Sequence, residues 1–556
     1  MDEKQREYIQ KLERRFGELK TRRAIYEQSW MEIAKLFFPM RSNWTDSEIP
    51  IKDDMVYDST GKLALNLMAN GFAGYIVTPN LKWFYADPTA DVENLPGIRE
   101  WFEAIRDHVL RKMANSNFYL QMHEMIRDAG SIATATMWIK ERLTDGKLTF
   151  QTLHPKQIYI DENHDKEITT VFRRFFMTKD EVVQQFGCYP PEWEYSVLND
   201  DNMDVKVEVR HAVELDKNYK TGKNFSSVYY LPGLDYMLEK KGFFQNPYIV
   251  WRYAVNSDEV YGYGPAHDVL SEVRSAQEIR KTQMQAAQLG TNPPKMIPNE
   301  LKGIARLTPG GHNYYDKPDR LISSIQMASN YPLSVDQIQH VIQMIKEAFN
   351  ADFFLMLQNA PPNRTATEVM EMQGEKAAIL SITTTRMMQE ALIPIIHRVI
   401  QIESDAGRLP LPPGDVKYDW KQIVRVMKIE FTGILPMLQK RTSTMQVYNQ
   451  TLQSLGGMMQ ILGPQVMDYF DGDAAVQEVL KMSGVTAKTI RDDLTVKKMR
   501  KDKAAQQQQM IAQQQQAELQ KTVAGKMDPN AKPQDGSPMA QIQGQMAAAM
   551  GGMNGQ

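Results

Sequence analysis

A few groups of residues in this sequence have types and spacing that could do chemistry, but none completes its motif. His123-Glu124 begins like a zinc-protease helix, yet no second His follows at the required spacing, so surface helix residues are the better interpretation. Asp471-Gly472-Asp473 matches the first part of a calcium loop but lacks the later ligands, which favours a helix-capping turn. These motifs therefore predict neither a zinc site nor a calcium site.

Phosphate and cation binding are equally poorly supported. No Gly-rich loop ending in Gly-Lys-Ser/Thr occurs, and Gly262-Tyr263-Gly264 lacks the third Gly of a dinucleotide fingerprint, so a turn before a helix is predicted there. One polar cluster could hold a cation, but a solvated turn is favoured; its members are Asp161, Glu162, His164 and Asp165. We therefore predict a protein that is not an enzyme and has no cofactor and no metal.

Composition narrows the class of protein. The 556 residues include 65 Lys plus Arg and 68 Asp plus Glu, a net charge of −3, which argues against a protein that grips nucleic acid through phosphate neutralisation. Cys188 is the only cysteine, so a reducing compartment is expected. The charged N-terminus, the mean hydropathy of −0.47 and the lack of a run of about 18 apolar residues predict neither a signal peptide nor a membrane span.

Hydrophobic periodicity predicts a mixed α+β region as far as about Arg252. Its helices are expected at Asp2 to Phe38, after Asp58-Ser59-Thr60-Gly61 towards Tyr75, at Pro96 to Asn115 and at Phe118 to Ala129. Its strands are expected at Thr134 to Glu141, Leu148 to Leu153, Gln157 to Ile160 and Ile168 to Phe176. A further strand is expected much later, at Ile423 to Phe431.

Long helices dominate the rest of the chain. One is predicted from Pro265 to Gly290, and a second starts at Ser334, with Gln337 as its capping-box partner, and ends before Asn359. A strand-and-turn insert separates them. A third helix opens at Thr365 and should be kinked at Pro394, because proline removes a backbone donor. Two long helices joined by an insert project from the body, and identical subunits meeting head to tail would close a ring around a channel.

Several short segments, in this order and spacing, resemble the portal proteins, the head-to-tail connectors of short-tailed, podovirus-type bacteriophages. The similarity runs from about Tyr8 to Pro413. Its most specific segments are Asp58-Ser59-Thr60-Gly61, Leu67-Met68-Ala69-Asn70-Gly71, Thr78-Pro79-Asn80-Leu81-Lys82-Trp83-Phe84, Tyr261-Gly262-Tyr263-Gly264-Pro265-Ala266, Asn363-Arg364-Thr365-Ala366-Thr367-Glu368-Val369, Ala391-Leu392-Ile393-Pro394-Ile395-Ile396-His397-Arg398 and Gly407-Arg408-Leu409-Pro410. One departure is Leu380-Ser381-Ile382, where family members often have Leu-Gly-Pro. The resemblance therefore does not predict the shape of the helix at this point.

The resemblance implies a predominantly α-helical portal fold with named parts. These are a wing (1–260), two stem helices (261–290 and 333–358), a clip (291–332), a tunnel loop (359–366), a kinked helix (367–408), a wing return strand (409–436), a crown (437–500) and a Gln- and Met-rich tail (501–556). The tail is either a helical barrel or, from about Asp528, disordered. The virion is the implied location, at one capsid vertex, after assembly in the host cytoplasm.

The resemblance also implies partners. They are a homo-oligomeric ring of about twelve subunits, the terminase large subunit, the major capsid and scaffold proteins, tail adaptor proteins and double-stranded DNA in the channel. No membrane is involved. Two rival classes remain, a virion structural or internal scaffold protein without a DNA channel and a capsid-associated nuclease. A near-balanced charge suits a channel whose wall must let the duplex pass without gripping it.

Candidate site residues follow from the resemblance. The tunnel loop in the channel is Asn359, Ala360, Pro361, Pro362, Asn363 and Arg364. Arg364 either meets phosphate or pairs with Glu368 or a neighbouring subunit. Capping of the supporting helix explains Thr365 and Glu368 without a ligand. In the clip, Lys295, Lys302 and Arg306 face DNA, the terminase or an adaptor, or are simply solvated.

Overall fold

The computed structural model describes most of the first 436 residues and little beyond them. The described ranges are 3–44, 56–89, 97–142, 145–199, 201–216, 223–291, 295–296, 323–324, 331–358, 377–413, 420–433 and 435–436, with 454, 496, 499–503, 505–511 and 513. The chain forms two compact units, Met1–Asp471 and Gly472–Gln556. Everything below concerns the first unit; in the second, the described residues are helical. The predicted mixture of helices and strands is confirmed.

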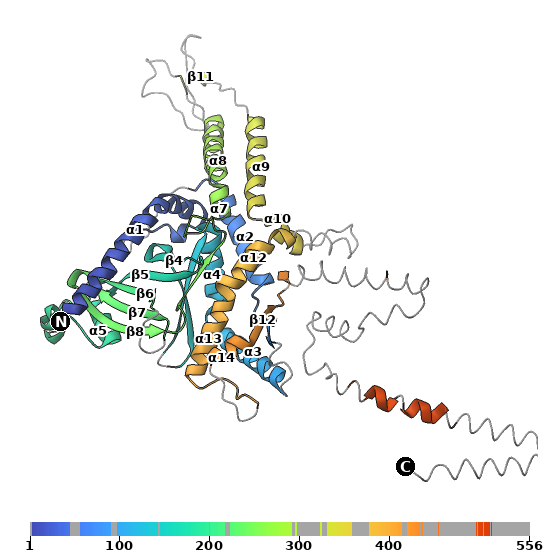
Figure 1. Cartoon of the computed structure of the whole chain (residues 1–556). Coiled ribbons are helices and arrows are strands. Elements are labelled where there is room, and N and C mark those ends of the chain that lie inside the picture. Colours follow the sequence, from blue (N-terminus) through green and yellow to red (C-terminus); the bar gives the residue numbers. More distant parts are fainter. Residues whose placement is uncertain are drawn as a thin grey trace, which may run out of the picture. The chain divides into compact units, whose positions relative to one another are not determined.

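The N-terminal helix α1 (Glu3–Phe37) lies across a five-stranded antiparallel sheet (Figure 1). The sheet has the order β4-β5-β6-β7-β8, from strands β4 (Ile158–Glu162), β5 (Ile168–Thr178), β6 (Lys206–Leu215), β7 (Phe225–Leu231) and β8 (Tyr236–Phe243). One face of α1 is apolar at helical spacing, and Leu12, Phe16 and Leu19 pack on Phe172 and Tyr230. This packing confirms the predicted first helix and covers one face of the sheet.

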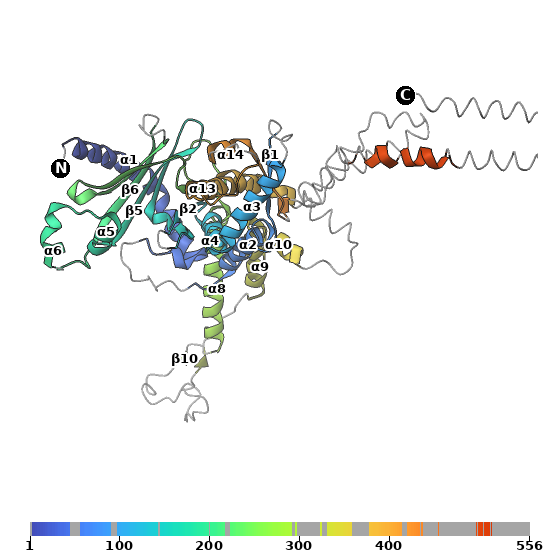
Figure 2. The ribbon, with the colours of Figure 1, turned by 90° about the horizontal axis from the view of Figure 1, so that it is seen from below.

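A second, smaller layer covers the other face. It consists of α5 (Lys179–Phe186), the 3₁₀ turn η3 (Pro191–Trp193) and α6 (Glu194–Asn199). Val182 and Trp193 are buried against Val209 of β6, whose side chain points away from α1 because successive strand residues alternate between faces. Figure 2 shows α1 and the α5–α6 layer on opposite sides of β5 and β6.

The centre of the unit is a large apolar cluster. Around it lie α2 (Thr60–Tyr75), α3 (Ile98–Ala114), α4 (Phe118–Ser131) and the three-stranded sheet β3-β2-β9, made of β2 (Thr134–Glu141), β3 (Leu148–Leu153) and β9 (Tyr248–Arg252). Strand β1 (Phe84–Pro88) pairs antiparallel with β12 (Met427–Phe431), so segments far apart in the sequence share one core. No described helix is both long enough and apolar enough to cross a membrane.

Two long helices stand side by side and project from this core (Figure 1). After the short α7 (Pro265–Asp268) come α8 (Leu270–Thr291) and, on the return, α9 (Tyr331–Ala348) and α10 (Ala351–Gln358). The described part of the insert is one strand pair, β10 (Lys295–Met296) with β11 (Ser323–Ser324). The predicted helical hairpin is present.

Details of the hairpin correct the sequence prediction. The first helix is interrupted at Val269, and the second begins at Tyr331, so Ser334 lies inside the first turn and is not the N-cap. The second helix is also not continuous to Gln358. Asn350 adopts a left-handed conformation (φ 52°) that asparagine tolerates, and this breaks the helix between α9 and α10.

The helix around Pro394 is irregular, as predicted, but the irregularity lies in the turn before the proline. It runs as α12 (Ser381–Arg386), a π-helix (Met387–Leu392) and α13 (Ile393–Asp405), and Ile393 donates its N–H to the carbonyl of Met388, five residues back. Leu380 forms a turn before α12. Ile423 is also corrected, because it lies in α14 (Trp420–Val426) and the strand β12 begins only at Met427.

Candidate functional site: the base of the helical hairpin

Most of the predicted site residues lie outside the described residues. These are the six loop residues Asn359 to Arg364, the capping pair Thr365 and Glu368, and the insert residues Lys302 and Arg306. Lys295 lies in β10, paired through its backbone with Ser324. The structure does describe α10, which ends at Gln358, and the chain again from residue 377.

The base of the hairpin is joined to the start of α2 by a compact set of hydrogen bonds. Gln277 on α8 accepts the N–H groups of Tyr57 (2.7 Å) and Asp58 (3.0 Å) through Oε1, and it donates Nε2 to the Asp58 carbonyl (2.6 Å). Asp58 Oδ1 accepts the N–H of Thr60 (2.9 Å), and Oδ2 accepts Arg280 Nε (3.3 Å). The segment from Asp58 to Gly61 is therefore an anchor for the first hairpin helix.

The sequence pointed to Asp58 but missed its partners. A carboxylate before a helix is a capping signal, whereas Gln277 and Arg280 look like ordinary polar residues on a long helix. A second anchor is Arg274, which forms a bidentate ion pair with Glu32 on α1. The hydrogen bond from Arg274 lowers the pKa of Glu32. Because this pair is largely exposed, it is worth little energy by itself.

Two glycines let α2 fit against both arms of the hairpin. A Cβ on Gly61 would lie 2.9 Å from Phe37 Cε1 and 3.3 Å from Val273 Cγ2 of α8. A Cβ on Gly71 would lie 2.1 Å from Phe354 Cδ1 of α10, the helix that leads directly to the predicted loop. The absence of side chains at these two positions therefore sets the distance between α2 and the arms of the hairpin.

The π-helix holds a carboxylate against the central sheet. Glu390 Oε2 accepts the N–H of Arg252 (2.9 Å), and Oε1 accepts Arg252 Nη2 (3.1 Å) and Arg386 Nη1 (3.0 Å). Arg252, which is buried, also bonds Glu162 (2.9 Å). A widened turn changes the direction in which its side chains point, so the irregular turn places Glu390 between Arg386 of α12 and Arg252 of β9.

The end of α13 is fixed by a second network. His108, Lys112 and Arg408 all reach the carboxylate of Glu403, at 2.9 to 3.1 Å. Burial raises the pKa of Glu403, but the three donors outweigh burial and hold the pKa at about 2. Arg408 also bonds Glu141 on β2 (2.8 Å), and the Pro410 carbonyl accepts Trp101 Nε1 (3.0 Å). The segment from Gly407 to Pro410 therefore ties the helix to β2 and α3.

The residues considered for catalysis have structural roles where the structure describes them. His123 bonds Asn70, Asp161 pairs with Arg15 and Arg22, and Glu162 pairs with Lys166 and Arg252. Gly262 lies so close to Ala133 that a Cβ would sit 2.2 Å from its carbonyl oxygen, as in a tight turn before a helix. Within the described ranges, no group of three His, Cys, Asp or Glu residues could hold a metal.

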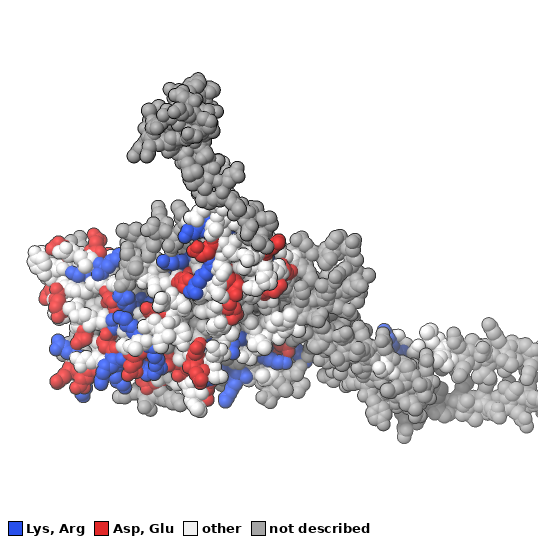
Figure 3. Space-filling model, turned by 90° about the horizontal axis from the view of Figure 1, so that it is seen from above, with Lys and Arg blue, Asp and Glu red and all other residues white. Residues whose placement is uncertain are grey.

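Acidic and basic side chains are interspersed over the described part of the face shown in Figure 3, without a dominant patch of either sign. This distribution agrees with the near-zero net charge of the whole sequence. The described part of this face is therefore not a strongly positive surface of the kind that holds DNA through its phosphates.

Comparison with known proteins identifies the family of this chain. Residues 9–490 match the model of the bacteriophage head to tail connecting proteins. The portal protein of Salmonella phage epsilon15 is 28% identical over 527 residues, which cover 90% of this chain and 92% of the relative. The probable portal protein of Bordetella phage BPP-1 is 28% identical over 515 residues, 89% of this chain and 91% of the relative. Because the family match spans most of the chain, this protein belongs to the bacteriophage head to tail connecting protein family.

Proposed function

We propose that this protein is a phage portal: a ring of about twelve subunits at one capsid vertex, through which DNA enters during packaging and leaves through the attached tail. It acts as a conduit and not as an enzyme. The family membership and the two portal relatives support this function. The rival interpretation, an internal scaffold protein without a channel, has no such support.

The structural observation that carries the proposal is the hairpin α8–α9. It is firmly anchored at its base by Gln277 and Arg280, yet beyond Ala276 none of the α8 residues with described exposure is buried. Figure 2 shows α8 standing clear of the body. A helix pair of this kind is covered when copies of it stand next to one another around a ring, and such a ring of helices encloses a channel.

Opposite faces of the five-stranded sheet suggest how neighbours meet. On the α5–α6 side, exposed carboxylates dominate: Asp180, Glu181, Glu192, Glu194, Asp201 and Asp204. On the α1 side, the exposed cations between residues 11 and 22 are Lys11, Arg14, Lys20 and Arg22. Large apolar side chains are exposed within both faces, Tyr195 and Leu198 on α6 and Ile25 on α1. A head-to-tail ring needs two different complementary faces, and we propose that these are part of its interface.

The proposed portal function assigns roles to the loop and insert residues named above. The loop of residues 359–364 lines the channel, with Arg364 as its phosphate contact, and Thr365 and Glu368 cap the helix that supports the loop. The insert with Lys295, Lys302 and Arg306 meets the terminase during packaging and the tail adaptors afterwards. The ring contacts capsid and scaffold proteins at the vertex.

Electron microscopy of the purified full-length protein tests the function. We expect closed rings of one size with a central channel wide enough for a DNA duplex, and rings that bind free DNA only weakly at physiological salt. Solid particles without a channel would support the scaffold interpretation instead. Metal-dependent cleavage of DNA by the pure protein would contradict the role as a conduit.

Charge reversal tests the proposed contact between neighbours. The double substitution Arg14→Glu and Lys20→Glu should weaken ring formation, because each change places like charges against the acidic α5–α6 layer. Glu192→Lys with Glu194→Lys should have the same effect. A chain carrying all four substitutions should regain rings, measured by light scattering or mass photometry at low and high salt. Rings of unchanged stability in both double variants would rule out this contact.

A further inference from the structure

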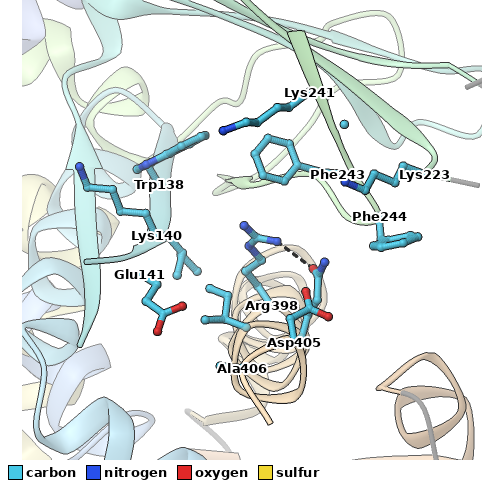
Figure 4. Close-up of a pocket in the computed structure, with 14 residues that line it drawn as sticks. Trp138, Lys140, Glu141, Lys223, Lys241, Phe243, Phe244, Arg398, Asp405 and Ala406 are labelled. Atoms are coloured by element: carbon cyan, nitrogen blue, oxygen red, sulfur yellow. Dashed lines mark hydrogen bonds between the residues drawn. The ribbon is translucent and has the colours of Figure 1, made fainter. Parts of the chain in front are cut away.

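A cavity of about 450 Å³ lies between the sheet strands and α13. Its walls come from β2, from the end of β8 and from the last two turns of α13 (Figure 4). The aromatic side chains of Trp138, Phe243 and Phe244 form its apolar part. This volume is within the range of small-molecule sites in proteins.

Arg398 is the unusual group in this cavity. Arg398 is only 8% exposed, and Figure 4 shows its side chain pointing from α13 into the space below Phe243. Nη1 donates to Gln401 Oε1 (2.8 Å), whereas the buried Nε has no hydrogen-bond partner among the described residues. Burial lowers the pKa of Arg398 to about 10, opposed by the charge of Asp405.

The charge and one donor of Arg398 are not satisfied by the described residues around it. A guanidinium stays charged at neutral pH, and a buried charge normally carries an ion partner and satisfied donors. In the described part of the chain, the hydrogen-bonded partner of Arg398 is the neutral amide of Gln401. Two carboxylates belong to the cavity wall: Glu141 is engaged by Arg408, and the charge of Asp405 favours the charged form of Arg398 without Asp405 being its hydrogen-bonded partner. The position opposite the free Nε is therefore suited to an external oxyanion.

The rim adds positive charge around this position. Lys140, Lys223 and Lys241 line the cavity. Figure 4 shows Lys241 on β8 and Lys223 beside Phe243, just before β7, and Lys241 is paired with Glu239 (2.6 Å). The Arg398 guanidinium carbon lies 5.1 Å from the centroid of the Phe243 ring, and Lys223 Nζ lies 5.7 Å from that of Phe244. Cations arranged beside aromatic faces suit a ligand that combines an anionic group with an apolar stem.

We propose that this cavity is a binding site for an oxyanion on an apolar stem, with Arg398 holding the anionic group and the aromatic side chains holding the stem. The anionic group is a carboxylate or a phosphate monoester, which share this recognition chemistry. A DNA duplex is excluded, because its phosphates cannot reach a buried guanidinium. The site does not depend on the portal function, and either can fail without the other.

Titration of the full-length protein with sodium benzoate and with inorganic phosphate, at constant ionic strength against chloride, tests the site. We expect saturable binding of at least one probe at one site per chain, with a rise in the unfolding temperature. Binding of benzoate alone identifies a carboxylate site, and binding of phosphate alone identifies a phosphate site. Absence of binding by both probes overturns the proposal.

Arg398→Met should reduce the affinity at least about 10-fold, since a hydrogen bond to a charged group is lost. In chloride alone, this variant should unfold at no lower temperature than the natural protein, because it removes an unpaired buried charge. Lys140→Gln and Lys223→Gln, which change exposed or rim positions, should each weaken binding several-fold and keep the test valid if Arg398→Met does not fold. Lys62→Gln, an exposed cation on α2, is the matched control. Equal affinity in all four variants would refute the assignment.

Discussion

Arg41→Met is expected to destabilise the fold by about 3–5 kcal/mol, because it leaves a fully buried carboxylate without its counter-ion. Arg41 follows α1 in the 3₁₀ turn η1 (Pro39–Arg41) and grips Asp128 of α4 with two hydrogen bonds, Nε to Oδ1 at 3.0 Å and Nη2 to Oδ2 at 2.9 Å. Asp128 is 0% exposed. The pair therefore joins the end of α1 to the central core.

The effect should depend on pH in a defined direction. Burial raises the pKa of Asp128 to about 6, against the opposing charge of Arg41, from an ordinary value of 3.8. A carboxyl group whose pKa is higher in the folded than in the unfolded state makes the protein less stable as the pH rises from the unfolded-state pKa to the folded-state pKa, because the unfolded chain loses its proton first. Without Arg41 the pKa rises further, so the loss of stability should continue above pH 6. The other charged neighbours, Glu124 and Arg127, remain and act in opposite directions.

Thermal unfolding of the full-length protein at about pH 5 and about pH 8 measures this difference. Arg41→Met should lose more stability at the higher pH than at the lower, relative to the natural protein at the same pH. Adding Asp128→Asn to Arg41→Met should recover part of the loss at the higher pH, because the amide carries no charge. A loss that is equal at both pH values and is not relieved by the second substitution would show that Arg41 acts only by packing.

Gly71→Ala and Gly74→Ala should change stability in opposite directions although both lie in α2. The methyl group added at position 71 would overlap Phe354 of α10, so about 1–3 kcal/mol should be lost. Nothing lies within 4 Å of a Cβ at position 74, so Gly74→Ala should gain up to about 1 kcal/mol from helix propensity. The midpoints of thermal or denaturant unfolding give the comparison.

A second substitution identifies the cause. Phe354 packs against Phe72, with ring centroids 5.6 Å apart, and a smaller side chain there would leave room for the new methyl group. Phe354→Leu should therefore cost less in the Gly71→Ala background than in the natural protein. Strictly additive effects of the two substitutions would contradict direct contact. Because α10 leads to residues 359–364, Gly71→Ala should also lower the amount of DNA packaged by assembled particles.

Helices and strands with strong periodicity were predictable, and their ends were less so. The strands Thr134–Glu141 and Leu148–Leu153 agree with the prediction residue by residue, because alternating apolar side chains and turn residues define them locally. The prediction that Ser334 starts the second helix was wrong, because the helix already begins at Tyr331. A capping pattern in the sequence does not exclude a helix that starts one turn earlier. The break at Asn350 had no clear signal, because a single asparagine lowers helix propensity only slightly and the residues on both sides of it keep the apolar periodicity of a helix.

The sequence by itself determined the class of protein. The order of its long helices, the insert between them and a set of short characteristic segments were sufficient to indicate a portal, and the family match confirms this. Local periodicity and motif spacing carry that information because they depend on neighbours in the chain. The loop residues 359–364 remain a prediction.

Only the tertiary structure decided which distant residues act together. Gln277 bonds Asp58, 219 residues away in the sequence, and Glu390 bonds Arg252, 138 residues away. No local sequence pattern predicts these contacts. The same is true of Arg398, a residue within a characteristic segment. Only the packing of α13 beside the strands shows that it is buried and that, among the described residues, its hydrogen-bonded partner is the neutral amide of Gln401. Burial and pairing depend on the whole fold, because they are set by side chains brought together from several elements.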